Sequence, residues 1–111
     1  MDKNFKVIFL EEAEKFLGSL DTKSQRKIIY NIRKVQVTRD SNLLKKLTDE
    51  IWEFRTLYNR NYYRLFAFLD KRNKNSTLII ATHGIIKSTA KIPKKEILKA
   101  EGMMKIYFQN N

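Results

Sequence analysis

Two arginines stand within a segment that otherwise has the composition of a protein core. Arg55 and Arg64 lie in the stretch EIWEFRTLYNRNYYRLFAFLD, which covers residues 50–70. Side chains alternate between the two faces of a β-strand, so Arg55 points away from the side that carries Trp52 and Phe54. Arg64 likewise points away from Leu65. If the two apolar sides pair, a turn of two or four residues makes the arginines neighbours on the other face.

Aromatic side chains accompany the arginines on that face. Three of them share the parity of Arg64: Tyr62, Phe66 and Phe68. Guanidinium groups bind phosphates and aromatic rings stack on bases, so the pattern is typical of a surface for single-stranded RNA. The alternative explanation is structural, with Arg55 in a salt bridge to Glu53 or Glu50 and Arg64 solvated.

A second basic segment, ATHGIIKSTAKIP, contains the only histidine, His83. We expect His83 to end a strand, Gly84 to permit a turn, and Lys87 and Lys91 to precede a helix whose N-terminus favours anions. An imidazole has an unperturbed pKa near 7, which suits proton transfer. A lone histidine is nevertheless more often structural than catalytic.

The charge of the chain indicates a polyanionic partner. The 111 residues include 23 Lys and Arg against 12 Asp and Glu, a formal +11 with a pI near 10. Residues 51–111 carry 12 of these basic residues and four acidic ones, so we expect the electropositive function there. Nucleic acid is the leading candidate, although an anionic membrane surface or an acidic protein would match the same charge.

Several functional classes lack support in the sequence. No apolar run approaches the roughly 20 residues that span a bilayer, and the N-terminus does not have the pattern of a secretory signal. The chain has no cysteine and one histidine, which argues against a disulfide framework and against a zinc site. We therefore expect a cytoplasmic protein with no membrane partner, no metal and no cofactor.

Hydrophobic periodicity predicts an α+β fold in a single domain over residues 1–111. The expected order is a strand, two helices, three antiparallel strands and a helix. The expected elements are a strand over Phe5–Leu10, a helix over Glu11–Leu20, a helix that Asp21 or Thr22 caps, strands over Ile51–Tyr58, Tyr62–Asp70 and Ser76–His83, and a helix after Pro93. We expect a polar connection at Lys45 and Lys46, and helices on one sheet face that leave the other partly free.

The segments EIWEFRTLYNRNYYRLFAF and THGIIKSTAKIPKKEILKA together resemble the phage-derived, HigB-type branch of the RelE toxin superfamily. The resemblance covers nearly the whole chain in element order, and its specific motifs lie between Glu50 and Ala100. Two departures are evident: Ser88 stands where a second basic residue is common, and Glu53 stands where better-known members have a lysine.

The resemblance implies a RelE-like fold and the toxin of a type II toxin–antitoxin pair. Such a toxin is a ribosome-dependent endoribonuclease, and its partners are mRNA, the ribosome and a cognate antitoxin of helix-turn-helix type. The arginines of the family's strands map onto Arg55 and Arg64. The family's loop histidine and the lysine after it map onto His83 and Lys87.

Cleavage of RNA through its own 2′-hydroxyl requires a proton acceptor, a proton donor and positive charge at the phosphate. We expect Arg55 and Arg64 to stabilise the phosphate and His83 or Lys87 to transfer protons. A further basic set would bind backbone phosphates: Lys45, Lys46, Arg60 and Lys91. Two alternatives remain open at this point: a non-catalytic basic module that binds RNA or protein, and a metal-dependent nuclease that uses Asp49, Glu50 and Glu53.

Overall fold

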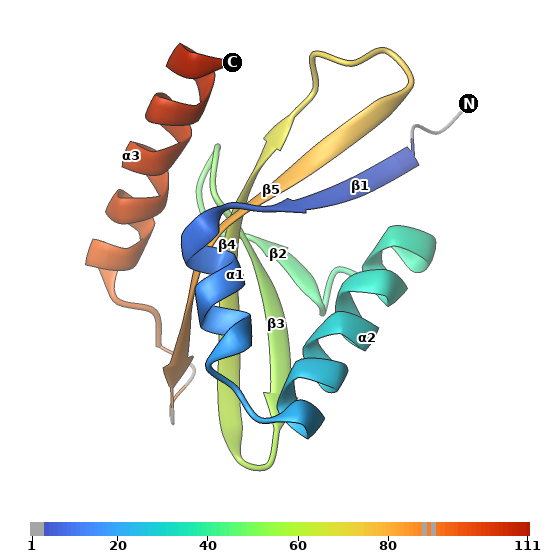
Figure 1. The fold of residues 1–111 in the computed structure, drawn as a ribbon, viewed down its shortest axis with the longest axis vertical. Helices are drawn as coiled ribbons and strands as arrows, with labels where there is room; N and C mark the ends of the chain where they lie inside the picture. The colour runs from blue at the N-terminus through green and yellow to red at the C-terminus, as the bar shows by residue number, and fades with distance from the viewer. Residues whose placement is uncertain (1–3, 88, 90) are drawn as a thin grey trace.

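The computed structural model describes residues 4–87, 89 and 91–111, and it contains three helices and five strands (Figure 1). The elements in chain order are β1 (Asn4–Phe9), α1 (Glu11–Gly18), α2 (Thr22–Thr38), β2 (Leu44–Lys46), β3 (Trp52–Tyr58), β4 (Asn61–Asp70), β5 (Ser76–Lys87) and α3 (Lys94–Asn110). The predicted α+β class is confirmed. Asp21 caps α2, because its side chain accepts a hydrogen bond from the backbone N–H of Ser24 at 2.7 Å.

The five strands form one mixed sheet in the order β1-β5-β4-β3-β2. The three strands predicted to be antiparallel, β3, β4 and β5, are antiparallel, and the N-terminal strand β1 joins the same sheet by parallel pairing with β5. Lys45 and Lys46, expected in a connection, belong to the short edge strand β2, which pairs with β3. A three-residue strand has too little hydrophobic pattern to be recognised from sequence, and it forms because β3 offers it an unpaired edge.

The β3–β4 hairpin has the register that the segregation of side chains predicts. Its turn consists of Asn59 and Arg60, whose φ angles of 52° and 66° match a two-residue turn of the type I′ family. Arg55 therefore pairs directly with Arg64, and Phe54 pairs with Leu65. The two arginines are cross-strand neighbours on one face, as predicted.

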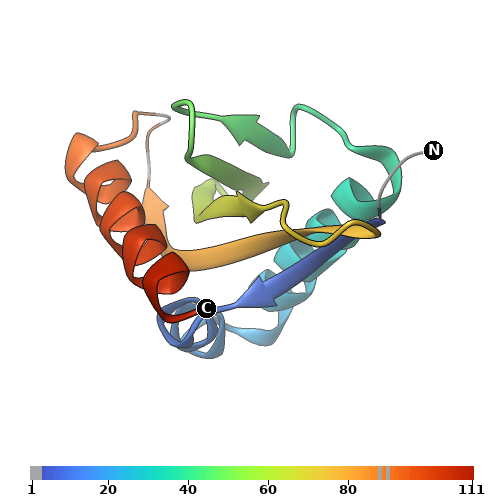
Figure 2. The same cartoon turned by 90° about the horizontal axis from the view of Figure 1, so that it is seen from above.

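Helices cover both faces of the sheet, so the prediction that they cover one face is wrong. The α1/α2 face carries Phe54, Leu65 and Ile79, and it packs against the first two helices. The opposite face, here called the α3 face, carries Phe66, Phe68 and Ile80, and the buried stripe of α3 packs on it. Figures 1 and 2 show the sheet between α3 on one side and α1 and α2 on the other. Phe66 and Phe68, which the alternation predicts on a nucleic-acid surface, are therefore core residues.

Strand β5 is longer than predicted and contains an irregularity at His83. Leu65 pairs with Gly84 and Ala67 with Ala81, so Thr82 and His83 together oppose the single residue Phe66. This two-against-one arrangement is a β-bulge, and it shifts the side-chain alternation of β5 by one residue. Beyond the bulge, Ile85 and Lys87 lie on the α3 face.

Gly84 lies within β5, and the turn expected there is absent. A Cβ atom at this position would lie 2.2 Å from the Phe16 ring of α1, too close for any side chain. The glycine is therefore required by the close approach of α1 to β5, and the chain continues as a strand to Lys87.

Candidate nucleic-acid interface

Basic side chains gather on the α3 face near the turn of the β3–β4 hairpin. Cross-strand pairing places Arg55 beside Arg64, and Arg64 pairs in turn with Ile85 of β5. In the row closer to the turn, Leu57 pairs with Tyr62 and Tyr62 with Lys87. Figure 1 shows this turn at the opposite end of the molecule from the C-terminus of α3. The strands thus bring Arg55, Arg64 and Lys87 onto one face of the sheet.

Glu53 lies at the inner edge of this surface and binds both arginines. Its Oε1 atom lies 2.5 Å from Nη1 of Arg64 and 3.5 Å from Nε of Arg55. Glu53 and Arg64 are each 1 % exposed, whereas the Arg55 side chain is 31 % exposed. The structural alternative is right about the salt bridge between Arg55 and Glu53 and wrong about Arg64, whose guanidinium is held in a buried ion pair and is not solvated. Arg55 is the arginine that reaches solvent.

The electrostatics of the cluster follow from burial and from the arginine pair. Burial raises the pKa of Glu53, and the nearby Arg64 and Arg55 oppose this rise because they favour the carboxylate. One oxygen, Oε2 of Glu53, is buried and has no hydrogen-bond partner among the described residues. The cluster contains two guanidinium groups and one carboxylate, so it carries a net positive charge. Of the two guanidinium groups, only that of Arg55 is exposed to solvent.

The surface around Arg55 has the composition of an RNA-binding site. The Arg64 guanidinium stacks over the Tyr62 ring at 5.2 Å from its centroid. Leu57 is 60 % exposed, so an apolar side chain faces solvent beside the tyrosine. Lys45 pairs with Glu53 across the β2–β3 edge and is exposed, which adds a cation next to the arginine pair.

His83 lies on the same face but is buried beneath the start of α3. Its ring stacks on Phe66 with centroids 4.9 Å apart and is 3 % exposed. Nδ1 lies 2.9 Å from the Thr82 hydroxyl and Nε2 lies 3.1 Å from Glu96 Oε1. Both ring nitrogens therefore have protein partners. The prediction that His83 ends a strand is wrong, because β5 continues to Lys87 and the bulge directs the His83 ring onto Phe66 in the core on the α3 face.

Charged residues of α1 and α3 surround the histidine. Burial lowers the pKa of His83, the hydrogen bond to Glu96 opposes this shift, and the charge of Lys99 adds to it. Lys99 itself forms an ion pair of 2.7 Å with Glu12, which links α3 to α1 across an open hollow above His83. This cluster covers the part of β5 beyond Ala81, where β1 no longer pairs with β5.

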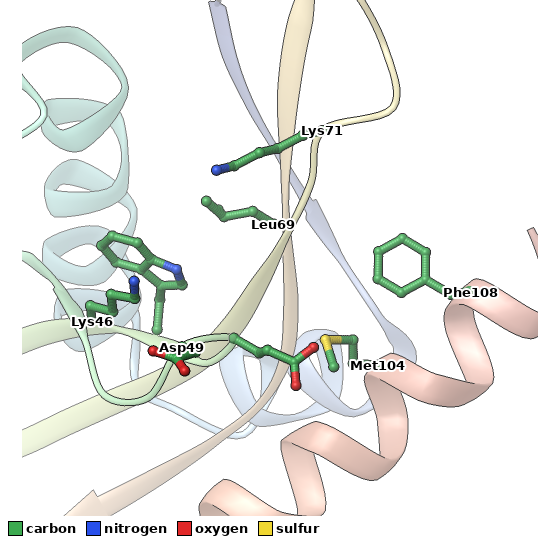
Figure 3. A pocket seen from close by; sticks show the side chains of 8 residues that line it. Lys46, Asp49, Leu69, Lys71, Met104 and Phe108 are labelled. Carbon is green, nitrogen blue, oxygen red and sulfur yellow. The ribbon is translucent and has the colours of Figure 1, made fainter.

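The remaining predicted phosphate ligands are dispersed. Arg60 is exposed in the hairpin turn, and Lys91 is exposed in the segment before α3. Lys46 lies over the Trp52 ring, 5.9 Å from its centroid, and lines a separate pocket of about 200 Å³. Figure 3 shows Lys46 and Asp49 on one side of that pocket and Met104 and Phe108 of α3 on the other. The structure does not bring Lys46 to the arginine pair.

The metal-dependent alternative finds no site in the part of the chain that the structure describes. No group of three His, Asp or Glu side chains that could hold a metal lies together in residues 4–87, 89 and 91–111. Asp49 and Glu50 are exposed in the β2–β3 connection, whereas Glu53 is buried against the arginines. The three carboxylates therefore do not converge.

Two acidic residues of the site lay outside the sequence prediction or were given another role. The structural alternative pairs Glu53 with Arg55, and the structure shows that Glu53 is the buried partner of Arg64 as well. Its parity with Arg55 was the available signal. Glu96 carried no signal, because only the docking of α3 brings its carboxylate to His83 across 13 positions of sequence.

Comparison with known proteins places most of the chain in one family. Residues 15–105 match the family described as phage-derived proteins like Gp49 (DUF891). A search of curated proteins finds no significant match. Among the helices of the described residues, none is both long and apolar enough to cross a membrane.

Proposed function

This chain belongs to the Gp49-like family of phage-derived proteins, a family associated with RelE-like toxins, and we propose that it is the toxin of a type II toxin–antitoxin pair. The proposed activity is ribosome-dependent cleavage of mRNA, by analogy with HigB-type toxins. A cognate antitoxin of helix-turn-helix type would hold the activity in check.

One observation carries the proposal more than any other. Arg55 and Arg64 are direct cross-strand neighbours, and Arg55 reaches solvent from β3, a strand that is paired on both sides. The buried carboxylate of Glu53 holds both guanidinium groups, so their positions are set before any ligand arrives. Preorganised positive charge of this kind stabilises a developing phosphorane without reorganisation at the moment of reaction.

The structure favours different roles for the two arginines. We assign phosphate contact to Arg55, which is exposed, and a positioning role to Arg64, whose buried guanidinium orients Glu53 and supports Tyr62. Lys87 lies in the open row beside Tyr62, which suits contact with the scissile phosphate or its leaving oxygen. Lys45, Arg60 and Lys91 would bind neighbouring backbone phosphates, and Lys46 has a weaker case.

The reaction needs only groups of the RNA and of the protein. The 2′-oxygen attacks phosphorus and forms the new P–O bond, the bond from phosphorus to the 5′-oxygen breaks, and a 2′,3′-cyclic phosphate and a 5′-hydroxyl result. One group must accept the 2′-hydroxyl proton and another must protonate the 5′-oxygen. We propose Lys87 for proton transfer in preference to His83, because both nitrogens of that buried ring already have partners.

The proposal is tested with mRNA on translating ribosomes. The full chain is added to ribosomes that carry a defined mRNA, and the cleaved ends are mapped and their rate of appearance measured. Arg55→Ala should slow cleavage by about 100-fold to 1000-fold, the effect of losing one preorganised electrostatic donor. Lys74→Ala is the control, because it removes one exposed charge in the β4–β5 connection and should leave the rate unchanged.

A non-catalytic module is the competing function, and the burial of His83 favours it. Such a module would bind ribosomes with the affinity of a toxin and produce no new mRNA ends. Folded wild-type protein that binds but does not cleave would establish this alternative and refute the proposed activity. Normal growth of cells that express the folded chain without an antitoxin would point the same way.

A further inference from the structure

The outer face of α2 carries charge of one sign only. Within Thr22–Thr38 there are five basic residues and no acidic one. These residues are Lys23, Arg26, Lys27, Arg33 and Lys34. The helix lies on the α1/α2 face, so the sheet separates it from the arginine pair (Figure 2). The candidate site described above therefore does not account for this charge.

The basic side chains form two rows on either side of an exposed tyrosine. At about 100° per residue, Lys23, Lys27 and Lys34 lie roughly 20–60° to one side of Tyr30. Arg26 and Arg33 lie about 40–60° to its other side. The buried residues of α2, which include Ile28, Ile32 and Val35, occupy the opposite side of the helix. All five cations thus share one outward arc, which runs about 16 Å along the helix axis.

These cations are not neutralised within the described part of the molecule. None of the five forms a salt bridge with an acidic side chain in residues 4–87, 89 and 91–111. The pKa of Asp21, which precedes the helix, is lowered mainly by its hydrogen bonds with Ser24 and to a smaller extent by the charge of Lys23. Tyr30 is 60 % exposed, and the Lys27 ammonium lies over its ring at 5.3 Å from the centroid. The face holds unneutralised positive charge and a solvent-facing phenol in its centre.

This surface suits RNA better than a protein partner. The centre of a protein interface is apolar and depleted of charge. On α2 the exposed apolar side chains are Tyr30 and Val37, two turns apart, and basic side chains flank them. Two cationic rows with a polar aromatic residue between them instead match the two phosphate strands that border the wide, shallow minor groove of A-form RNA.

We propose that the outer face of α2 is a second RNA-binding site, which grips the backbone of double-stranded RNA across its minor groove. The lysine row contacts one phosphate strand, the arginine row contacts the other, and the Tyr30 hydroxyl reaches the 2′-hydroxyl groups between them. In combination with the proposed function, on which this placement rests, the site would dock the toxin onto a ribosomal RNA helix while the arginine pair faces the mRNA.

The experiment measures binding of the full chain to a labelled 20-base-pair RNA duplex between 50 and 300 mM salt. Two double variants each remove two charges from one row: Arg26→Gln/Arg33→Gln removes the whole arginine row, and Lys27→Gln/Lys34→Gln leaves only Lys23 of the lysine row. Each should reduce the slope of log affinity against log salt by about 1.8, because two phosphate contacts are lost at about 0.9 each. At 100 mM salt this corresponds to affinity roughly 60-fold weaker. The control Lys74→Gln/Lys105→Gln makes the same charge change at exposed positions elsewhere and should leave the slope nearly unchanged.

The result separates this inference from the proposed function. Equal losses in both α2 variants and in the control would mean that bulk charge binds the duplex, and the inference would be wrong. Unchanged duplex binding together with lost binding to a poly-glutamate peptide would identify α2 as a site for an acidic protein, which also overturns it. Failure of the wild type to cleave mRNA, with duplex binding still dependent on α2, would refute the toxin activity and leave the second site intact.

Discussion

The replacement Arg64→Ala should destabilise the protein strongly, although Arg64 sits on the candidate site. Removal of the guanidinium leaves the carboxylate of Glu53, which is 1 % exposed, without its closest partner. Breaking a buried ion pair by removing one member costs about 3–5 kcal/mol. Arg55 remains 3.5 Å from Glu53 and softens the loss, so we expect about 3 kcal/mol.

This free energy is measurable as a shift of the thermal midpoint. For 111 residues the entropy of unfolding is about 0.23 kcal/mol/K, so a loss of 3 kcal/mol lowers the midpoint by roughly 13 °C. Arg55→Ala is the matched control, because it removes the same group from the same carboxylate at a partly exposed position. An ion pair of that kind contributes about 1 kcal/mol or less, which corresponds to about 4 °C.

A double replacement tests whether the buried pair itself is the cause. Replacing both members, as in Glu53→Leu/Arg64→Met, removes the uncompensated charge and should restore most of the lost stability. The assay is thermal unfolding followed by circular dichroism for the wild type, the two single arginine variants and the double variant. Midpoints of Arg64→Ala and Arg55→Ala within a few degrees of each other would refute the reasoning, as would a double variant no more stable than Arg64→Ala.

Three further outcomes follow from other contacts. Gly84→Ala should lower the thermal midpoint well beyond the effect of an ordinary surface change, because the Cβ of the alanine would overlap the Phe16 ring. An unchanged midpoint would contradict the close approach of α1 to β5. Tyr107→Phe removes a 2.8 Å hydrogen bond to the Asp70 carboxylate, whose pKa lies well below its usual range. The free energy of unfolding, measured in urea at pH 7, should fall by about 1.5–3 kcal/mol. The effect of the replacement should become small once the pH is low enough to protonate that carboxylate. Burial lowers the pKa of His83, so the stability tied to its neutral form is present above about pH 6.5 and is lost as the pH falls through the lowered folded value. In His83→Gln, the free energy of unfolding should therefore change less between pH 7 and pH 5 than in the wild type.

The hairpin and the arginine pair were predictable from sequence because they depend on local rules. A strand alternates with a period of two, and the apolar set containing Leu65 had to lie on one side, which placed Arg55 and Arg64 together on the other. The helical periodicity of α2 and α3 can likewise be recognised in the sequence. The buried residues of α3, Ala100 and Met104, lie four positions apart and so on one side of the helix.

The exposure of the candidate residues was decided by tertiary structure alone. Whether the face with Phe66 meets water or a helix depends on where α3 docks, and no local pattern in the strands encodes that position. The bulge at Thr82 and His83 is a mismatch between two strands, so β5 read in isolation could not reveal it.

The sequence by itself determined the α+β class, the pairing of the arginines and a strong positive charge, because residue type and short-range periodicity specify each of them. The tertiary structure decided that Arg64 is buried with Glu53, that His83 is closed in by Glu96, and that Arg55 is left to meet solvent. The physical reason is that burial and ion pairing depend on the packing of segments far apart in the chain, and such packing sets which of several identical charges a ligand can reach.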